Sequence, residues 1–147
     1  MTDILTGYLI DAKAGTIRSV EINRQDALKS IYAHIDCTCI DIVRIGDYHI
    51  AYCDDNGLVD GLECFTQLAD FPSPLAGNLL VTGENEEGDS VSPTHSIDLV
   101  AGRFLISRAV FDPAFEHIEE PGIIGTRVAG FTIRVQQNQP TIIGSEV

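Results

Sequence analysis

Residues 37–61, CTCIDIVRIGDYHIAYCDDNGLVDG, contain the pattern that decides the fold. Two segments of this stretch, 38–44 and 48–54, are rich in β-branched and aromatic residues, which favour strands. Gly46-Asp47 lies between them and has the residue types of a tight turn. The pattern therefore predicts a β-hairpin in the first half of the chain.

The register of this hairpin decides which side chains share a face, because successive side chains of a strand point to opposite sides of the sheet. A two-residue loop at Gly46-Asp47 would mix polar and apolar residues on both faces. A three-residue loop at 45–47 separates them, so we predict this second register. It sets three pairs directly opposite one another: Ile42 with Ile50, Ile40 with Tyr52, and Cys39 with Cys53.

The segments on either side of the hairpin predict more strands and one main helix. Residues 4–10 and 16–22 have strand composition, and the loop between them ends at Gly15. The apolar run 77–83 is bounded by glycines and predicts a buried strand. Asn23 is the expected N-cap of the helix. Apolar residues then follow at helical spacing: Ala27, Leu28, Ile31, Tyr32 and Ile35.

The second half of the chain carries weaker signals. Ser92-Pro93 predicts the start of a helix and Gly102 its end. Residues 104–111 fit a helix or a strand, and residues 112–122 are expected to be irregular because Asp-Pro and Pro-Gly pairs bound them. Four further segments are assigned from local pattern: a helical turn at 65–71, an acidic loop at 84–92, a strand at 129–135 and an edge strand at 141–143. In the strand at 129–135, alternation places Ala129, Phe131, Ile133 and Val135 on one face.

These elements predict an α+β protein. We expect a mostly antiparallel sheet built from hairpins, with one main helix packed on it and a C-terminal β extension. The length of 147 residues fits a single domain, 1–147. In this domain residues 93–147 extend the part formed by residues 1–92.

The charge of the chain excludes some partners and favours others. The formal net charge is −13, and both halves are acidic: residues 1–75 have 5 basic and 12 acidic side chains, and residues 76–147 have 4 and 10. Direct nucleic-acid binding is therefore not expected, whereas a basic or nucleic-acid-handling host protein is a suitable partner. No apolar run approaches the ~20 residues of a membrane-spanning helix. The N-terminus lacks a secretory signal, so we expect a cytoplasmic protein without membrane contact.

The N-terminal two-thirds of the chain resembles a family of short uncharacterised proteins of bacteria, phages and plasmids. The resemblance covers about residues 3–92 and rests on turn and strand signals. The matching positions are Asp11, Gly15, Asp54, Asp55, Gly57, Gly77 and Gly83, while the segment Glu63-Cys64-Phe65 departs from the family pattern. The resemblance implies an α+β fold and no established activity. Its association with mobile elements suggests an accessory role.

The cysteines are the candidate metal ligands. Cys37 and Cys39 share one face of a strand, and the predicted register brings Cys53 and His49 to the same face. These four residues could hold zinc or iron. The spacing differs from the usual zinc knuckles, and in a reducing compartment buried structural cysteines or a redox pair explain the same pattern.

Other chemistry has less support in the sequence. Asp54-Asp55, with Asp60 and Glu63, could bind a divalent cation, but the spacing is not that of a calcium loop. No nucleophile elbow or phosphate-binding loop is present, so we expect no cofactor and no catalytic residues. The main hypothesis is a non-catalytic binding or accessory protein that engages a protein partner. The alternative is a metal protein or enzyme centred on the cysteine-bearing hairpin. The open edges of short hairpins also make a homodimer plausible.

Overall fold

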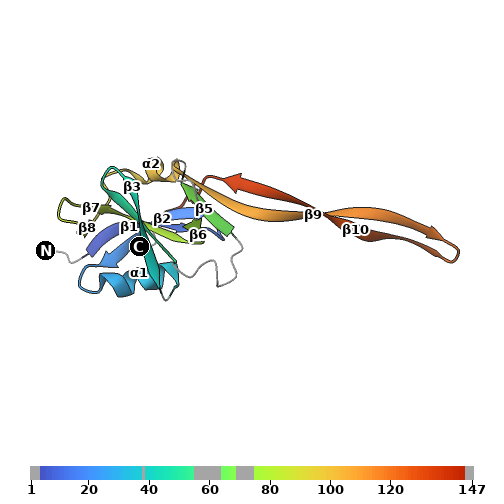
Figure 1. Ribbon diagram of the computed structural model, residues 1–147, viewed down its shortest axis with the longest axis horizontal. Helices are drawn as coiled ribbons and strands as arrows, with labels where there is room; N and C mark the ends of the chain where they lie inside the picture. Colours follow the sequence, from blue (N-terminus) through green and yellow to red (C-terminus); the bar gives the residue numbers. More distant parts are fainter. Residues whose placement is uncertain (1–3, 38, 55–63, 69–74, 145–147) are drawn as a thin grey trace.

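The computed structural model describes residues 4–37, 39–54, 64–68 and 75–144. Within these ranges the chain forms two sheets and two helices (Figure 1). The elements in chain order are β1 (Ile4–Asp11), β2 (Thr16–Asn23), α1 (Ala27–Ile35), β3 (Ile40–Gly46), β4 (His49–Asp54), β5 (Cys64–Leu68), β6 (Leu75–Ala76), β7 (Leu79–Glu84), β8 (Ser90–Val91), α2 (Ile97–Ala101), β9 (Phe104–Glu120), β10 (Ile123–Asn138) and β11 (Thr141–Ile142).

The larger sheet has β7 between β1 and β4. Its strand order is β11-β2-β1-β7-β4-β3, and β8 pairs with the end of β7. Its pairs are antiparallel except for β11 and β2, which run parallel. The predicted first hairpin, the buried strand at 77–83 and the C-terminal edge strand are thus confirmed as β1–β2, β7 and β11.

Both faces of the larger sheet are covered, which gives the protein two hydrophobic clusters. The first cluster joins residues of both sheets and of α2, including Phe104 from β9. The second lies where α1 packs on the larger sheet through Ile31 and Ile35. Leu79 belongs to the first cluster and its neighbour Leu80 to the second, as expected for alternating side chains of a strand. This double cover explains why β7 is almost wholly buried.

The central hairpin is present as β3 and β4, but its predicted register is wrong by two residues. Asp47 and Tyr48, with φ of 52° and 60°, form the turn, and the ladder is irregular between Arg44 and Gly46. This irregularity buries Ile45 in the first cluster. The observed pairs are Arg44 with Ile50, Ile42 with Tyr52, Asp41 with Cys53 and Ile40 with Asp54. Because the shift is an even number, the faces remain as predicted.

The helices begin later than their sequence signals predict. The N-cap of α1 is Asp26, while the Asn23 side chain accepts a hydrogen bond from the Gln25 N–H in the preceding turn. The N-cap of α2 is Ser96 instead of Ser92, and its hydroxyl accepts from the Leu99 N–H. The expected end of this helix near Gly102 is confirmed.

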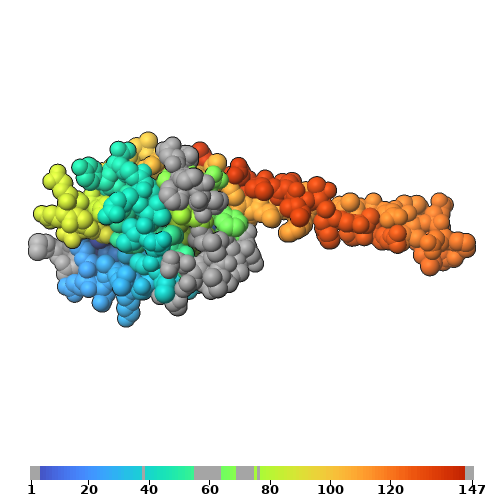
Figure 2. All heavy atoms as spheres, viewed as in Figure 1, coloured from blue at the N-terminus to red at the C-terminus, as the bar shows by residue number. Residues whose placement is uncertain are grey.

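The smaller sheet has the order β10-β9-β5-β6 and contains the main departure from the sequence predictions. The described part of the expected helical turn at 65–71 is strand β5, and residues 104–111 are strand. The expected irregular region at 112–122 is instead a continuous hairpin, whose two strands meet at Pro121-Gly122. This hairpin projects from the rest of the protein as a long, narrow rod (Figures 1 and 2). We call residues 109–135 the arm and the other described residues the body.

The α+β class is confirmed only in outline. The sheet is mostly antiparallel and carries a C-terminal β extension, but strands dominate more than a fold with one main helix would suggest. Across the described ranges, neither helix is long and apolar enough to cross a membrane.

Candidate interaction surface

The four predicted metal ligands do not converge. Cys53 is buried in the first cluster, where its Sγ donates to the Asp41 carbonyl oxygen at 3.8 Å. Cys37 packs against the second cluster, and Cys39 is exposed. The structure links none of the chain's cysteines, all of which it describes, by a disulfide. Among the described residues, no three His, Cys, Asp or Glu side chains lie close enough to hold a metal ion.

His49 has a structural role in the body. Its side chain is 1% exposed and stacks on His95, with 4.3 Å between ring centroids. Its Nε2 accepts from the His95 backbone N–H at 3.3 Å, so Nδ1 carries the proton and donates to the Asp47 carbonyl oxygen at 2.7 Å. Burial lowers the pKa of His49, which favours the neutral ring that this arrangement needs. Both ring nitrogens are thus used in joining two loops.

The pKa of Cys37 is shifted in the direction that makes the thiol unreactive. Partial burial raises this pKa above its ordinary value, and the negative charge of Asp54 raises it further. Because the thiolate is both the nucleophile and the metal ligand, these surroundings disfavour either role for Cys37. The raised pKa agrees with a packing function against the second cluster.

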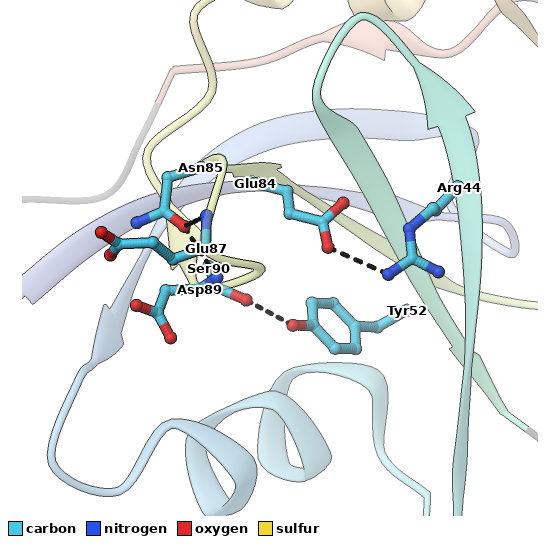
Figure 3. Close-up of polar contacts among 7 residues, drawn as sticks. All are labelled: Arg44, Tyr52, Glu84, Asn85, Glu87, Asp89 and Ser90. Carbon is cyan, nitrogen blue, oxygen red and sulfur yellow. Dashed lines mark hydrogen bonds and ion pairs between the residues drawn. The ribbon is translucent and has the colours of Figure 1, made fainter.

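Polar contacts of Asn85, Glu84 and Ser90 hold the loop beside the hairpin (Figure 3). The Asn85 side-chain oxygen accepts from the N–H groups of Glu87 and Asp89 and closes the turn before β8. Arg44 contacts Glu84 at 3.1 Å, and the hydroxyls of Tyr52 and Ser90 are hydrogen-bonded at 2.5 Å. Of the other proposed cation ligands, Asp54 is half-buried in β4, whereas Asp55, Asp60 and Glu63 lie outside the described residues.

One small pocket lies at the base of the arm. It is lined by Gly15, Ile106, Arg108, Asn138 and Gln139 and has a volume of about 40 Å³. Ligand sites usually measure ~300–1,000 Å³, so this pocket has room for little more than water.

The largest surface feature is one face of the arm. On β9 the face carries Phe111, Pro113 and Phe115, and the intervening Asp112 and Ala114 lie on the opposite face. On β10 it carries Ile133, which pairs with Phe111, and Val128, which pairs with Phe115. We call this surface the apolar face of the arm. Its six large side chains are 49–67% exposed: Phe111, Phe115, Val128, Phe131, Ile133 and Val135.

An irregularity in the ladder keeps the apolar face continuous. Phe131 and Val128 are three residues apart, so regular alternation would place them on opposite faces. Gly130 pairs with Ala114 and Val128 pairs with Phe115, which leaves Ala129 as an extra residue. A bulge of this kind resets the alternation. Val128 therefore rejoins the face of Phe131.

The opposite face, which we call the polar face of the arm, carries two ion pairs together with Val110, Ala114 and Ile118. Arg134 contacts Asp112 at 2.7 Å, and Arg127 contacts Glu116 at 3.3 Å. Strand periodicity indicated that Ala129, Phe131, Ile133 and Val135 share a face. The structure confirms this for Phe131, Ile133 and Val135, whereas Ala129 is the extra residue of the bulge. The sequence reasoning missed the matching residues of β9, because the Asp-Pro and Pro-Gly pairs suggested irregular structure there.

Comparison with known proteins gives the class of this chain. Residues 5–105 match the family described as "Domain of unknown function (DUF3846)", and the chain belongs to this family. The resemblance inferred from residues 3–92 is therefore confirmed. The matched residues end at the start of β9, so the family domain does not include the arm or the C-terminal part of the body with β11.

Two rhizobial proteins are similar over most of the chain. The "Uncharacterized protein y4iR" of Sinorhizobium fredii is 30% identical over 141 residues, which is 92% of this chain and 87% of that protein. "Protein PsiB" of Rhizobium leguminosarum bv. phaseoli is 27% identical over 132 residues, 87% of this chain and 98% of its own. Both alignments cover more of the chain than the family domain does, so they extend into the arm. No solved structure matches the chain at a significant level.

Proposed function

We propose that this protein acts by binding another protein molecule rather than by catalysis, and that the apolar face of the arm is its contact surface. The observation that carries this proposal is the uninterrupted row of six exposed apolar side chains. At roughly 100 Å² of exposed surface each, they present about 600 Å², more than the few hundred Å² that soluble monomers usually leave exposed in one patch.

The weak support of the arm also favours a binding role. Strand β5 pairs with β9 only as far as Arg108. Beyond that residue, the described part of the chain gives the hairpin no third strand. A two-stranded hairpin is at best marginally stable by itself in water. Contact along its apolar face would therefore stabilise the arm as well as the complex.

A second candidate contact is the acidic body, which fits a basic or nucleic-acid-handling host protein. Residues 104–138 have three basic and four acidic side chains, whereas the rest of the chain has six and eighteen. The charge is therefore concentrated away from the arm. Binding of a basic protein to the body should weaken as salt is raised, because the charges are screened. Binding that is unchanged between low and high salt would contradict this second contact.

Photo-cross-linking inside cells tests the role of the arm. The aromatic photoprobe p-benzoylphenylalanine replaces Phe131 on the apolar face or, as a matched control, Thr132 on the polar face. The chain is expressed in a rhizobial host, because the relatives come from rhizobia. We expect irradiation to produce a defined protein adduct from position 131 and far less from position 132. Equal yields at the two positions, or none, would contradict the proposal.

A further inference from the structure

We infer that the apolar face of the arm binds the same face of a second copy of this chain. The two copies would be related by a two-fold axis, with their arms antiparallel. This inference rests on the proposed function, because it names the partner of the same surface.

The first argument is that the apolar face is self-complementary. Its middle pair is Phe131 with Pro113. On the body side, the next pair of this face is Ile133 with Phe111; on the tip side it is Val128 with Phe115. Each of these flanking pairs combines one phenylalanine with one β-branched residue, so the pairs on either side of the middle match. The next pairs of the face are Val135 with Ala109 towards the body and Thr126 with His117 towards the tip. A two-fold axis through the middle pair would set each flanking pair against its counterpart, as an isologous interface requires.

The second argument is the area of the face. Two faces of about 600 Å² each would bury roughly 1,200 Å² in total, which is at the lower end of the ~1,200–2,000 Å² of specific protein interfaces. The face also excludes charge from its centre: the ion pairs of Asp112 and Glu116 lie on the opposite side of the arm. His117 and Glu119 share the apolar face only towards its tip. The centre could thus be buried without leaving a charge unpaired.

The third argument is electrostatic and selects the antiparallel arrangement. Outside the arm the chain has seven basic and eighteen acidic side chains, a net charge of −11, so two copies repel each other there. Parallel arms would place the bodies side by side. Antiparallel arms would instead hold their bases roughly 27 Å apart, from about eight residues at ~3.4 Å each. This separation is several times the Debye length of ~8–10 Å, so most of the repulsion would be screened.

The test is the molar mass of the full chain in solution, measured by sedimentation velocity at concentrations from ~1 to ~100 µM. Two variants add the same charge to adjacent positions of β10. In a dimer, Phe131→Lys would bring the lysine ammonium groups of the two copies together near the two-fold axis. Thr132→Lys would instead place the ammonium group of each copy on the polar face, opposite Asp112. We expect the wild-type chain and Thr132→Lys to have a molar mass of twice the 16.0 kDa of one chain, and Phe131→Lys to have the mass of a monomer.

The outcomes separate this inference from the proposed function. If the wild-type chain is a monomer and the photoprobe variant at position 131 captures a different protein, the inference of a second copy is overturned, whereas the proposed binding function stands. A dimer that Phe131→Lys leaves intact would place the interface elsewhere and overturn the inference. Far-ultraviolet circular dichroism of each variant checks folding. If Phe131→Lys unfolds the chain, Ile133→Lys on the same face replaces it, with the same expected loss of the dimer.

Cross-link mapping tests the direction of the arms. A photoprobe at Ile133 should react with the second copy near Phe115 and Val128 if the arms are antiparallel. Reaction mainly with the region around position 133 of the second copy would show parallel arms and contradict the electrostatic argument.

Discussion

The burial of Ile45 permits a sharp test of the central hairpin. Ile45 is 6% exposed and belongs to the first hydrophobic cluster, whereas Ile42 of the same strand is 50% exposed. Replacing each by alanine removes the same three carbon atoms. For Ile45 the lost burial and the cavity should lower the free energy of unfolding by about 2–5 kcal/mol. For Ile42 the loss should stay below about 1 kcal/mol, because half of the side chain is already in water.

Urea unfolding measures this difference directly. The chain lacks tryptophan, so circular dichroism and tyrosine fluorescence are suitable signals. We expect the Ile45→Ala midpoint to fall well below that of Ile42→Ala, with similar slopes for both variants. The predicted register places Ile45 in the loop, whereas Ile42 lies on the same face of the hairpin in both registers. An Ile42→Ala variant that is as destabilised as Ile45→Ala would therefore contradict the observed burial of Ile45 and exposure of Ile42.

Three further predictions concern other parts of the molecule. Burial lowers the pKa of His49 below its ordinary value of 6.5. Below about pH 6.5 the unfolded chain therefore binds a proton that the folded chain excludes, so the free energy of unfolding falls as the pH decreases. Thermal unfolding between pH 7 and 5.5 should show a steeper loss for the wild-type chain than for His49→Gln; parallel curves would contradict this assignment. Deletion of Ala129 should leave the oligomeric state unchanged, because Val128 and Gly130 can keep their partners Phe115 and Ala114 and hence their faces. If the deletion variant sediments as a monomer, the bulge itself is required. Arg44→Ala should lower the free energy of unfolding by less than about 1 kcal/mol, because its ion pair with Glu84 is largely exposed on the arginine side; a larger loss in urea unfolding would indicate that the loop depends on this contact.

The sequence predicted strands and faces better than it predicted registers and ends. The apolar run at β7 and the alternation in β3 and β4 follow directly from local composition. The hairpin register was wrong because Gly46 is a typical turn residue, whereas the turn uses Asp47 and Tyr48 with positive φ, which non-glycine residues rarely adopt. Burial of Ile45 in a cluster formed by distant strands favours this turn, and no local pattern contains that information.

The arm was missed for a different physical reason. Pro113 and Pro121 indicate breaks in regular structure, yet Pro113 is within a strand and Pro121 is at the turn. Proline is tolerated in a strand that has an open edge, because the missing N–H group can face solvent. Periodicity showed that Phe131 and Ile133 share a face. It could not show that this face projects from the body and is exposed.

The central claim is that the apolar face of the arm is covered by protein in solution. Hydroxyl-radical footprinting tests it with a built-in reference, because Phe131 is 65% exposed and Tyr48 on the body is 67% exposed in a single chain. The oxidation rate of each residue is divided by its rate in the unfolded chain. At a chain concentration of ~100 µM we expect Phe131 to be protected while Tyr48 reacts freely. On dilution, the protection of Phe131 should disappear. Equal reactivity of Phe131 and Tyr48 at all concentrations, and in cells, would contradict the claim.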